Sequence, residues 1–251
     1  MRTIGLIGGM SWESSAEYYR IINQRVRDQL GPLRSAQVLM YSVDFGPVEQ
    51  AQHAGRWDDT ALILEDAARR LQAGGAECVV LCTNTMHLVA PRIEAAVSIP
   101  FLHIADAAAA AAVAAGTLTV GLLGTAFTME QDFLTSRLAA QGLTVLVPHA
   151  EERRAVHRII YEELCVGVIS DASRQVYLRV IESLAARGAQ AVILGCTEIS
   201  LLVKPEHSDL PLLDTTELHA QAAVAFALEG QADWRRRAML RVSTNTPSRR
   251  A

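Results

Sequence analysis

The chain has 251 residues, of which 50% are hydrophobic, and a formal net charge of -4 at pH 7. This composition is typical of a globular protein with one large or two small domains. The lack of a basic balance argues against a nucleic-acid partner, and no apolar stretch approaches the roughly 20 residues of a membrane span. No secretory signal pattern precedes the first predicted strand. We therefore expect a cytoplasmic protein that binds a small molecule.

Four cysteines occur in the chain, and none of them lies in a Cys-x-x-Cys pair. Cys78 and Cys82 have no second pair or histidine at the spacing of a zinc site, so no metal is expected. Free thiols stay reduced in the cytoplasm and serve either packing or chemistry. Cys78 and Cys82 fit the pattern of small buried core residues. Cys165, on a helix predicted over 156–166, fits either the core or a pocket lining.

Apolar, β-forming segments alternate with segments of helical periodicity along the first half of the chain. An apolar run ends at Gly8-Gly9 and leads into an amphipathic helix. These glycines match neither a Walker loop nor the GxGxxG pattern. The alternation predicts an α/β fold with parallel sheets covered by helices. The expected strands span 3–7, 37–43, 78–81 and 99–104, and the expected helices span 14–30, 60–73 and 105–115.

The second half of the chain repeats the first. Four echoes occur in the same order, at offsets between 111 and 116 residues. Such a series argues for an internal duplication rather than for chance similarity. The paired positions are TIGLIG at 3–8 with TVGLLG at 119–124, Gly75-Ala76 with Gly188-Ala189, Thr83 with Cys196, and Pro100 with Pro211.

The duplication predicts two pseudo-symmetric parallel-sheet domains. Residues 1–99 form the first domain in this interpretation, and residues 100–209 form the second. A helix predicted over 217–228 crosses back onto the first domain, which therefore also includes 210–230. Residues 231–251 carry arginines among serine, threonine and proline, and we expect a basic, weakly ordered tail.

Two predicted strands end in small polar residues at equivalent positions of the repeats. VVLCTNTMH at 79–87 leads to Thr83, and VILGCTEIS at 192–200 leads to Cys196. The carboxyl ends of parallel strands often carry functional groups, and two pseudo-symmetric lobes bring these ends together at one cleft. A proton-transferring group on each side of a cleft suits a reaction in which a proton leaves one face of a carbon and returns to the other.

Six motifs extend over most of the chain: TIGLIGGMSWES from Thr3, SAQVLMYSVDF from Ser35, LCTNTMH from Leu81, LHIADA from Leu102, LLGTAFTMEQDF from Leu122 and GCTEI from Gly195. On these motifs the chain resembles the aspartate/glutamate racemases, in particular the branch of broad-specificity or L-Asp/Glu-specific bacterial amino-acid racemases. The resemblance implies two flavodoxin-like domains with the active site in the cleft between them. It also implies an amino-acid substrate, a homodimer, and no need for pyridoxal phosphate or a metal.

One position departs from the two-thiol members of that family. Their first catalytic cysteine directly precedes Asn-Thr, and here that position is Thr83. Cys82 comes one residue earlier, and since side chains alternate along a strand, it is expected to point away from the site. The resemblance therefore pairs Thr83 with Cys196, which takes the α-proton of an L-amino acid. A hydroxyl is a poor base, so the two directions of the reaction are expected to be unequal.

A substrate carboxylate fits the helix N-termini that follow both strands, where Asn84, Thr85 and Thr197 converge with backbone N–H groups. Glu198 is a capping or orienting candidate in the same stretch. The family resemblance adds further substrate contacts, which are Met10, Ser11, Gln52 and Thr125. It also places Cys165 where many aspartate racemases carry a lysine for the side-chain carboxylate. That difference argues against an exclusively acidic substrate.

Two other functions remain open on the sequence. An arylmalonate-type decarboxylase of the same superfamily also uses a thiol only in the second repeat, and carbon dioxide release separates it from a racemase. A non-catalytic two-lobed binding protein needs no reactive thiol, so ligand binding that is insensitive to iodoacetamide favours it. His87 and His103 lie beside apolar residues and are interpreted as hydrogen-bonded structural groups.

Overall fold

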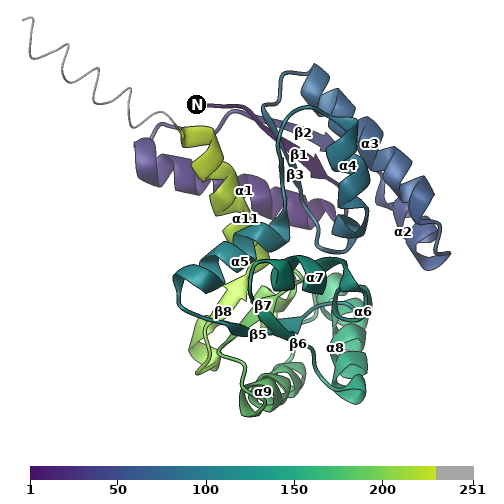
Figure 1. Ribbon diagram of the computed structural model, residues 1–251, viewed down its shortest axis with the longest axis vertical. Coiled ribbons are helices and arrows are strands. Elements are labelled where there is room, and N and C mark those ends of the chain that lie inside the picture. Colours follow the sequence, from purple (N-terminus) through teal and green to yellow (C-terminus); the bar gives the residue numbers. More distant parts are fainter. Residues whose placement is uncertain (230–251) are drawn as a thin grey trace, which may run out of the picture.

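The computed structural model describes residues 1–229, which form two lobes, each built on a four-stranded parallel sheet (Figure 1). The predicted tail, 231–251, lies outside the described residues. The strand order is β2-β1-β3-β4 in the first sheet and β6-β5-β7-β8 in the second. The second lobe therefore repeats the first strand for strand. This confirms the predicted α/β fold with two pseudo-symmetric domains.

The central strands are the most apolar segments of the chain. β1, β3 and β7 are buried along their whole length, as continuous apolar runs in the middle of a parallel sheet are. The first sheet contains β1 (Ile4–Gly8), β2 (Val38–Ser42), β3 (Cys78–Leu81) and β4 (Phe101–Leu102). The second contains β5 (Thr119–Leu123), β6 (Thr144–Leu146), β7 (Ala191–Leu194) and β8 (Leu212–Asp214).

Helices cover both faces of the sheets, and among residues 1–229 none is long and apolar enough to cross a membrane. The α-helices that follow strands of the first sheet are α1 (Trp12–Leu30), α2 (Phe45–His53), α3 (Trp57–Ala73), α4 (Ala90–Ala96) and α5 (Ile104–Ala114). Those of the second repeat are α6 (Ala126–Glu130), α7 (Asp132–Ala140), α8 (Ala150–Glu162), α9 (Asp171–Ala186), α10 (Ile199–Leu202) and α11 (Thr215–Leu228). The 3-10 helices of residues 1–229 are η1 (Thr85–Val89), η2 (Leu164–Val166) and η3 (Pro205–His207).

The last helix of each repeat covers the opposite lobe. α5 directly follows β4 of the first sheet, yet its alanines, such as Ala105 and Ala108, pack against β5 and β7 of the second sheet. α11 follows β8 of the second sheet and packs on α1 through Ala220 and Ala223. The two helices also contact each other where the lobes meet (Figure 1). The expected return of the last helix is thus observed, and it has a counterpart in α5 that the sequence did not indicate.

The strands place the passages between lobes later than the expected boundaries at 99/100 and 209/210. β4 pairs with β3 in the first sheet, and β8 pairs with β7 in the second. The chain therefore changes lobe after β4 and after β8 rather than before them. The expected strand over 99–104 is shorter, because His103 already caps α5. The position of such a two-residue strand is set by its hydrogen bonds with the neighbouring strand, and the two residues themselves do not specify which strand that is.

Three buried histidines meet where α5, α11 and η1 join, and we call His87, His103 and His219 the histidine cluster. His219 Nε2 donates to the Leu102 carbonyl at 2.6 Å, which leaves Nδ1 to accept from the Tyr18 hydroxyl at 2.9 Å. Burial lowers the pKa of His103 to about 3, that of His219 to about 4, and that of His87 well below its usual value. The cluster is therefore neutral at pH 7.

Candidate active site

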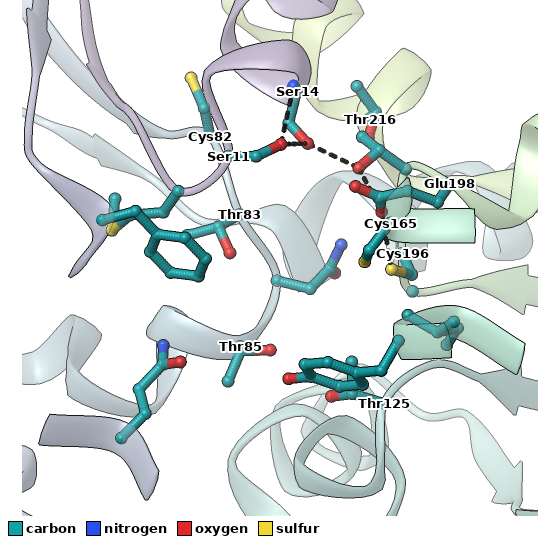
Figure 2. Close-up of a pocket in the computed structure, with 18 of the residues that line it drawn as sticks. Ser11, Ser14, Cys82, Thr83, Thr85, Thr125, Cys165, Cys196, Glu198 and Thr216 are labelled. Carbon is teal, nitrogen blue, oxygen red and sulfur yellow. Dashed lines mark hydrogen bonds between the residues drawn. The ribbon is translucent and has the colours of Figure 1, made fainter. Parts of the chain in front are cut away.

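A cavity of about 110 Å³ lies between the lobes, at the carboxyl ends of both sheets. This volume holds a ligand of several heavy atoms. All the site residues expected from the sequence line it, and Figure 2 shows most of them around one central space. The lining consists of Met10, Ser11, Ser14, Tyr18, Phe45, Gln52, Cys82, Thr83, Asn84, Thr85, Thr125, Ile160, Tyr161, Cys165, Gly195, Cys196, Thr197, Glu198 and Thr216.

Cys196 leaves the end of β7 and forms a hydrogen-bonded pair with Glu198. Its thiol donates to Glu198 Oε2 over 2.9 Å, and the Thr197 hydroxyl donates to the same oxygen over 2.8 Å. Burial raises the pKa of the Cys196 thiol well above its usual value, and the neighbouring Glu198 carboxylate raises it further. The resting site therefore contains a protonated thiol beside an acceptor for its proton.

A chain of hydroxyl groups connects this pair to the first lobe. Ser14 Oγ lies 2.7 Å from Thr197 Oγ1, and Ser11 Oγ lies 3.3 Å from Ser14 Oγ (Figure 2). Each hydroxyl has one hydrogen, and that of Thr197 goes to Glu198, so Ser14 donates to Thr197 and Ser11 to Ser14. Ser11 is also the N-cap of α1. Two hydroxyls from the start of α1 thus direct their dipoles, through the Thr197 hydroxyl, at a carboxylate of the other lobe.

Thr83 follows the end of β3, opposite Cys196. Its side chain points into the central space, whereas the Cys82 sulfur points away from it (Figure 2). Cys82 is fully buried and packs with Tyr18 and Ile22, as strand alternation predicts. The Thr83 carbonyl accepts a 2.7 Å hydrogen bond from His87 Nδ1. Within residues 1–229 the Thr83 hydroxyl has no hydrogen-bond partner, so it is available to a ligand.

Asn84 closes the same side of the cavity and is 93% buried. Its side-chain amide donates to Thr215 Oγ1 at 3.1 Å, and Thr215 in turn donates to the Leu194 carbonyl at 2.8 Å. These bonds fix Asn84 to the second lobe. The Asn84 Oδ1 atom is buried and has no hydrogen-bond partner in the described part of the chain. An unpaired buried acceptor beside a cavity indicates a place for a ligand donor.

The other expected contacts already have structural partners. Thr125 caps α6 by accepting from the Thr128 N–H at 3.4 Å, and Gln52 donates to the Met86 sulfur at 2.7 Å. Cys165 is exposed and lies in η2, because α8 ends at Glu162; the expected helix over 156–166 is thus wrong in its last residues. Partial desolvation of the sulfur, although the residue as a whole is exposed, raises the pKa of its thiol to about 11.

The helix N-termini expected to bind a carboxylate are short. β3 leads into the five-residue 3-10 helix η1, and β7 leads into the four-residue α10. α10 is a single turn, which sums few peptide dipoles, whereas η1 continues directly into α4 at Ala90. On the side of β7, recognition therefore has to come from individual hydroxyl and N–H groups such as those of Thr197.

Sequence reasoning missed several of the lining residues. Ser14 and Tyr18 extend the SWESS stretch along α1, and their spacing from Ser11 by three and seven residues was a usable signal. Tyr161 comes from α8, and burial raises its pKa to about 12. Thr216 comes from α11, the helix that crosses between the lobes. We identified no local sequence pattern that indicated Tyr161 or Thr216 as a residue of the cavity.

Glu198 is the only charged residue in the lining, which contains no lysine, arginine or histidine from the described part of the chain. A second carboxylate on a bound amino acid therefore finds no cation in this cavity. No group of three or more histidine, cysteine or acidic residues within 1–229 is placed to hold a metal ion.

Comparison with known proteins gives this cavity a family context. The model of the Asp/Glu/hydantoin racemase family matches residues 7–223. The chain is similar to a Yersinia pestis protein assigned to the Asp/Glu racemases, whose crystal structure is 53% identical with a TM-score of 0.88 and covers 91% of this chain and 100% of that one. It is also similar to an aspartate racemase homologue from Pyrococcus horikoshii OT3, at 33% identity and a TM-score of 0.82, over 91% of this chain and 100% of that one.

A curated relative is the broad-specificity amino-acid racemase RacX of Bacillus subtilis (strain 168). It is 22% identical over 238 residues, which cover 91% of this chain and 99% of that protein. The family match extends over most of the chain, including both strand ends that form the cavity. The chain therefore belongs to the Asp/Glu/hydantoin racemase family.

Proposed function

We propose that the protein is a cofactor-independent amino-acid racemase of the aspartate/glutamate type, with Cys196 as the base and Thr83 on the opposite side of the substrate. One observation carries the proposal. Equivalent positions of the two repeats, one a thiol and the other a hydroxyl, line one small cavity between the lobes. Family membership supports the same reaction. We also infer a homodimer, which sedimentation of the purified protein tests.

Glu198 makes the thiol usable as a base. Because the Cys196 thiol already donates to the Glu198 carboxylate, its proton passes to that carboxylate as substrate binds, and the resulting thiolate takes the α-proton. A water molecule held by the Thr83 hydroxyl protonates the opposite face of the carbon and becomes hydroxide. The proton on Glu198 neutralises this hydroxide through solvent, so the thiol and the carboxylate return to their resting forms.

The α-carboxylate and the α-ammonium group have different partners in this arrangement. The hydroxyls of Thr85 and Thr125 and nearby backbone N–H groups suit the carboxylate. The unpaired Asn84 Oδ1 suits the ammonium group, since it is an acceptor without a donor. Fixing both groups leaves the Cα–H bond directed along the line between Cys196 and Thr83.

Because a thiol, Cys196, lies on one side of the substrate and a hydroxyl, Thr83, on the other, the L-to-D and D-to-L reactions are expected to differ. The two enantiomers have equal free energies, so kcat/KM is the same in both directions. The difference is expected in kcat and KM separately, and in α-proton exchange, which is faster from the L-enantiomer because only Cys196 is a competent base.

Proton exchange in deuterated water, followed by chiral chromatography, tests the proposal. Cys196→Ser is expected to abolish α-proton exchange from L-amino acids. Thr83→Ala is expected to reduce inversion more than exchange, since it leaves the base in place. Cys78→Ala is the matched thiol control, because Cys78 is buried in β3 outside the cavity. Exchange that survives in Cys196→Ser contradicts the assignment of the base.

The same experiment separates the alternatives. A decarboxylase of the same superfamily releases carbon dioxide from a disubstituted malonate and leaves amino acids unchanged. A non-catalytic binding protein retains an amino acid without exchanging its α-proton, and alkylation of Cys196 does not alter that binding.

A further inference from the structure

A second and larger cavity, of about 740 Å³, opens beside the first. Its lining includes Ser11, Cys165, Thr197, Glu198 and Thr216, all of which also line the small cavity. These shared residues form the passage between the two spaces. A ligand whose reacting carbon lies between Thr83 and Cys196 therefore has room to extend its side chain past Cys165 and Glu198 into the larger cavity.

The larger cavity carries negative charge. Its lining contains five carboxylates and, in the described chain, no lysine, arginine or histidine. Two of the carboxylates are neutralised from outside: Glu17 pairs with Arg20, and Glu217 pairs with Arg25. The other three, which are Glu13, Asp214 and Glu198, have no cationic partner within residues 1–229.

The three unneutralised carboxylates come from different parts of the fold. Glu13 lies in the first turn of α1, Asp214 at the end of β8, and Glu198 in the loop after β7. Asp214 accepts the N–H groups of Thr216 and Glu217, and Glu198 accepts from Cys196 and Thr197. No hydrogen bond or ion pair within 1–229 occupies Glu13. A cation in the cavity is thus within the field of three carboxylates, one of which is unengaged.

Two buried oxygen atoms in the walls also lack partners. Asn84 Oδ1 borders the small cavity, and Thr216 Oγ1 belongs to a residue that lines both and is 98% buried. The Asn84 amide oxygen only accepts, whereas the Thr216 hydroxyl both donates and accepts, and buried polar atoms are normally hydrogen-bonded. This observation is independent of the carboxylates, and it indicates that a ligand brings polar groups to the two cavities.

We propose that the larger cavity is the side-chain subsite of the substrate and that the protein acts best on amino acids with a cationic side chain, an amine or a guanidinium at the end of a chain of methylenes. This inference rests on the proposed racemase function and specifies its substrate class. An aspartate or glutamate side chain placed in the same cavity faces three like charges and no cation.

Three substrates test the proposal on the full-length protein by α-proton exchange in deuterated water: L-lysine, L-norleucine, which is its uncharged analogue of similar length, and L-glutamate. We expect kcat/KM for lysine to exceed that for norleucine at least tenfold, and that for glutamate by more. High salt is expected to reduce the ratio of lysine to norleucine, because ions screen the carboxylates. A preference for glutamate, or equal rates for lysine and norleucine, overturns the inference while the racemase function stands.

A variant pair assigns the effect to the cavity. Glu13→Gln removes an unengaged carboxylate without breaking a hydrogen bond, and we expect it to lower the ratio of lysine to norleucine about fivefold. Glu151→Gln, whose side chain is 93% exposed on α8, makes the same change in net charge and is expected to leave that ratio unaltered. Equal effects of the two variants overturn the subsite assignment. Absence of exchange with every amino acid overturns the proposed function itself.

Discussion

Glu198→Gln is expected to make Cys196 more reactive toward an alkylating agent while making the enzyme less active. Glu198 accepts the thiol proton at 2.9 Å, and its negative charge raises the pKa of Cys196. The amide of glutamine neither carries this charge nor accepts a proton. The two measurements therefore change in opposite directions, which a merely structural role for Glu198 does not predict.

The size of the first effect follows from the charge. Two unit charges about 4 Å apart interact by about 4 kcal/mol at an effective dielectric constant of about 20. Glu198 is only half-buried, so we discount this to about 2 kcal/mol for solvent screening, and removing the charge lowers the pKa of Cys196. The thiolate fraction at pH 8 then rises about 30-fold. A less basic thiolate is a weaker nucleophile, and this offsets part of the gain in thiolate fraction, so alkylation is expected to be about fivefold faster in the variant.

The second effect is the loss of the proton acceptor. General acid–base groups contribute about 100-fold to 10000-fold, so α-proton exchange in Glu198→Gln is expected to fall at least about 100-fold. Iodoacetamide labelling, with mass spectrometry of the Cys196 peptide, measures the first effect and separates it from labelling of the exposed Cys165. Glu162→Gln, an exposed carboxylate on α8, is the charge-matched control. Slower or unchanged alkylation of Cys196, or retained exchange activity, refutes the reasoning.

Three further predictions concern the site and the fold. Thr83→Cys places a base on both sides of the substrate, so kcat from D to L is expected to rise at least about tenfold, measured by chiral chromatography. The pKa values of the histidine cluster are depressed in the folded state, so the unfolded chain binds more protons than the folded one below about pH 6.5. The free energy of unfolding is therefore expected to fall by up to about 4 kcal/mol per pH unit between about pH 6.5 and about pH 4. Urea unfolding at several pH values measures this. Gly195→Ala brings a Cβ to 2.9 Å from the Leu123 carbonyl, so a loss of about 2 kcal/mol is expected in urea unfolding, whereas Gly46→Ala, with no contact under 3.5 Å, is expected to change stability by less than about 1 kcal/mol.

The place of a residue around the cavity could be predicted from the sequence where it depends on the residue's own strand. Thr83 and Cys196 each follow a run of buried β-forming residues, and parallel strands direct their carboxyl ends to one edge of the sheet. The orientation of Cys82 away from the cavity follows from the same alternation. These are properties of consecutive residues, so the order of the chain is sufficient to find them.

Prediction failed where a residue's place depends on distant contacts. Cys165 lies after α8 rather than in it, and Thr216 lies in the first turn of α11, directly after the three-residue strand β8. The short strands β4 and β8 join their sheets through hydrogen bonds with β3 and β7. Nothing in a two- or three-residue segment specifies that neighbour, so the expected domain boundaries were a few residues early.

The sequence by itself determined the α/β fold, the duplication and the equivalent positions of a thiol, Cys196, and a hydroxyl, Thr83, because periodicity and repeats are properties of the residue order. Only the tertiary structure decided what surrounds that pair. The bond between Ser14 and Thr197 joins residues 183 positions apart, and the acidic cavity gathers Glu13, Glu198 and Asp214 from three separate elements. The charges that a substrate meets therefore depend on how the two lobes pack against each other, and local patterns carry no information about that packing.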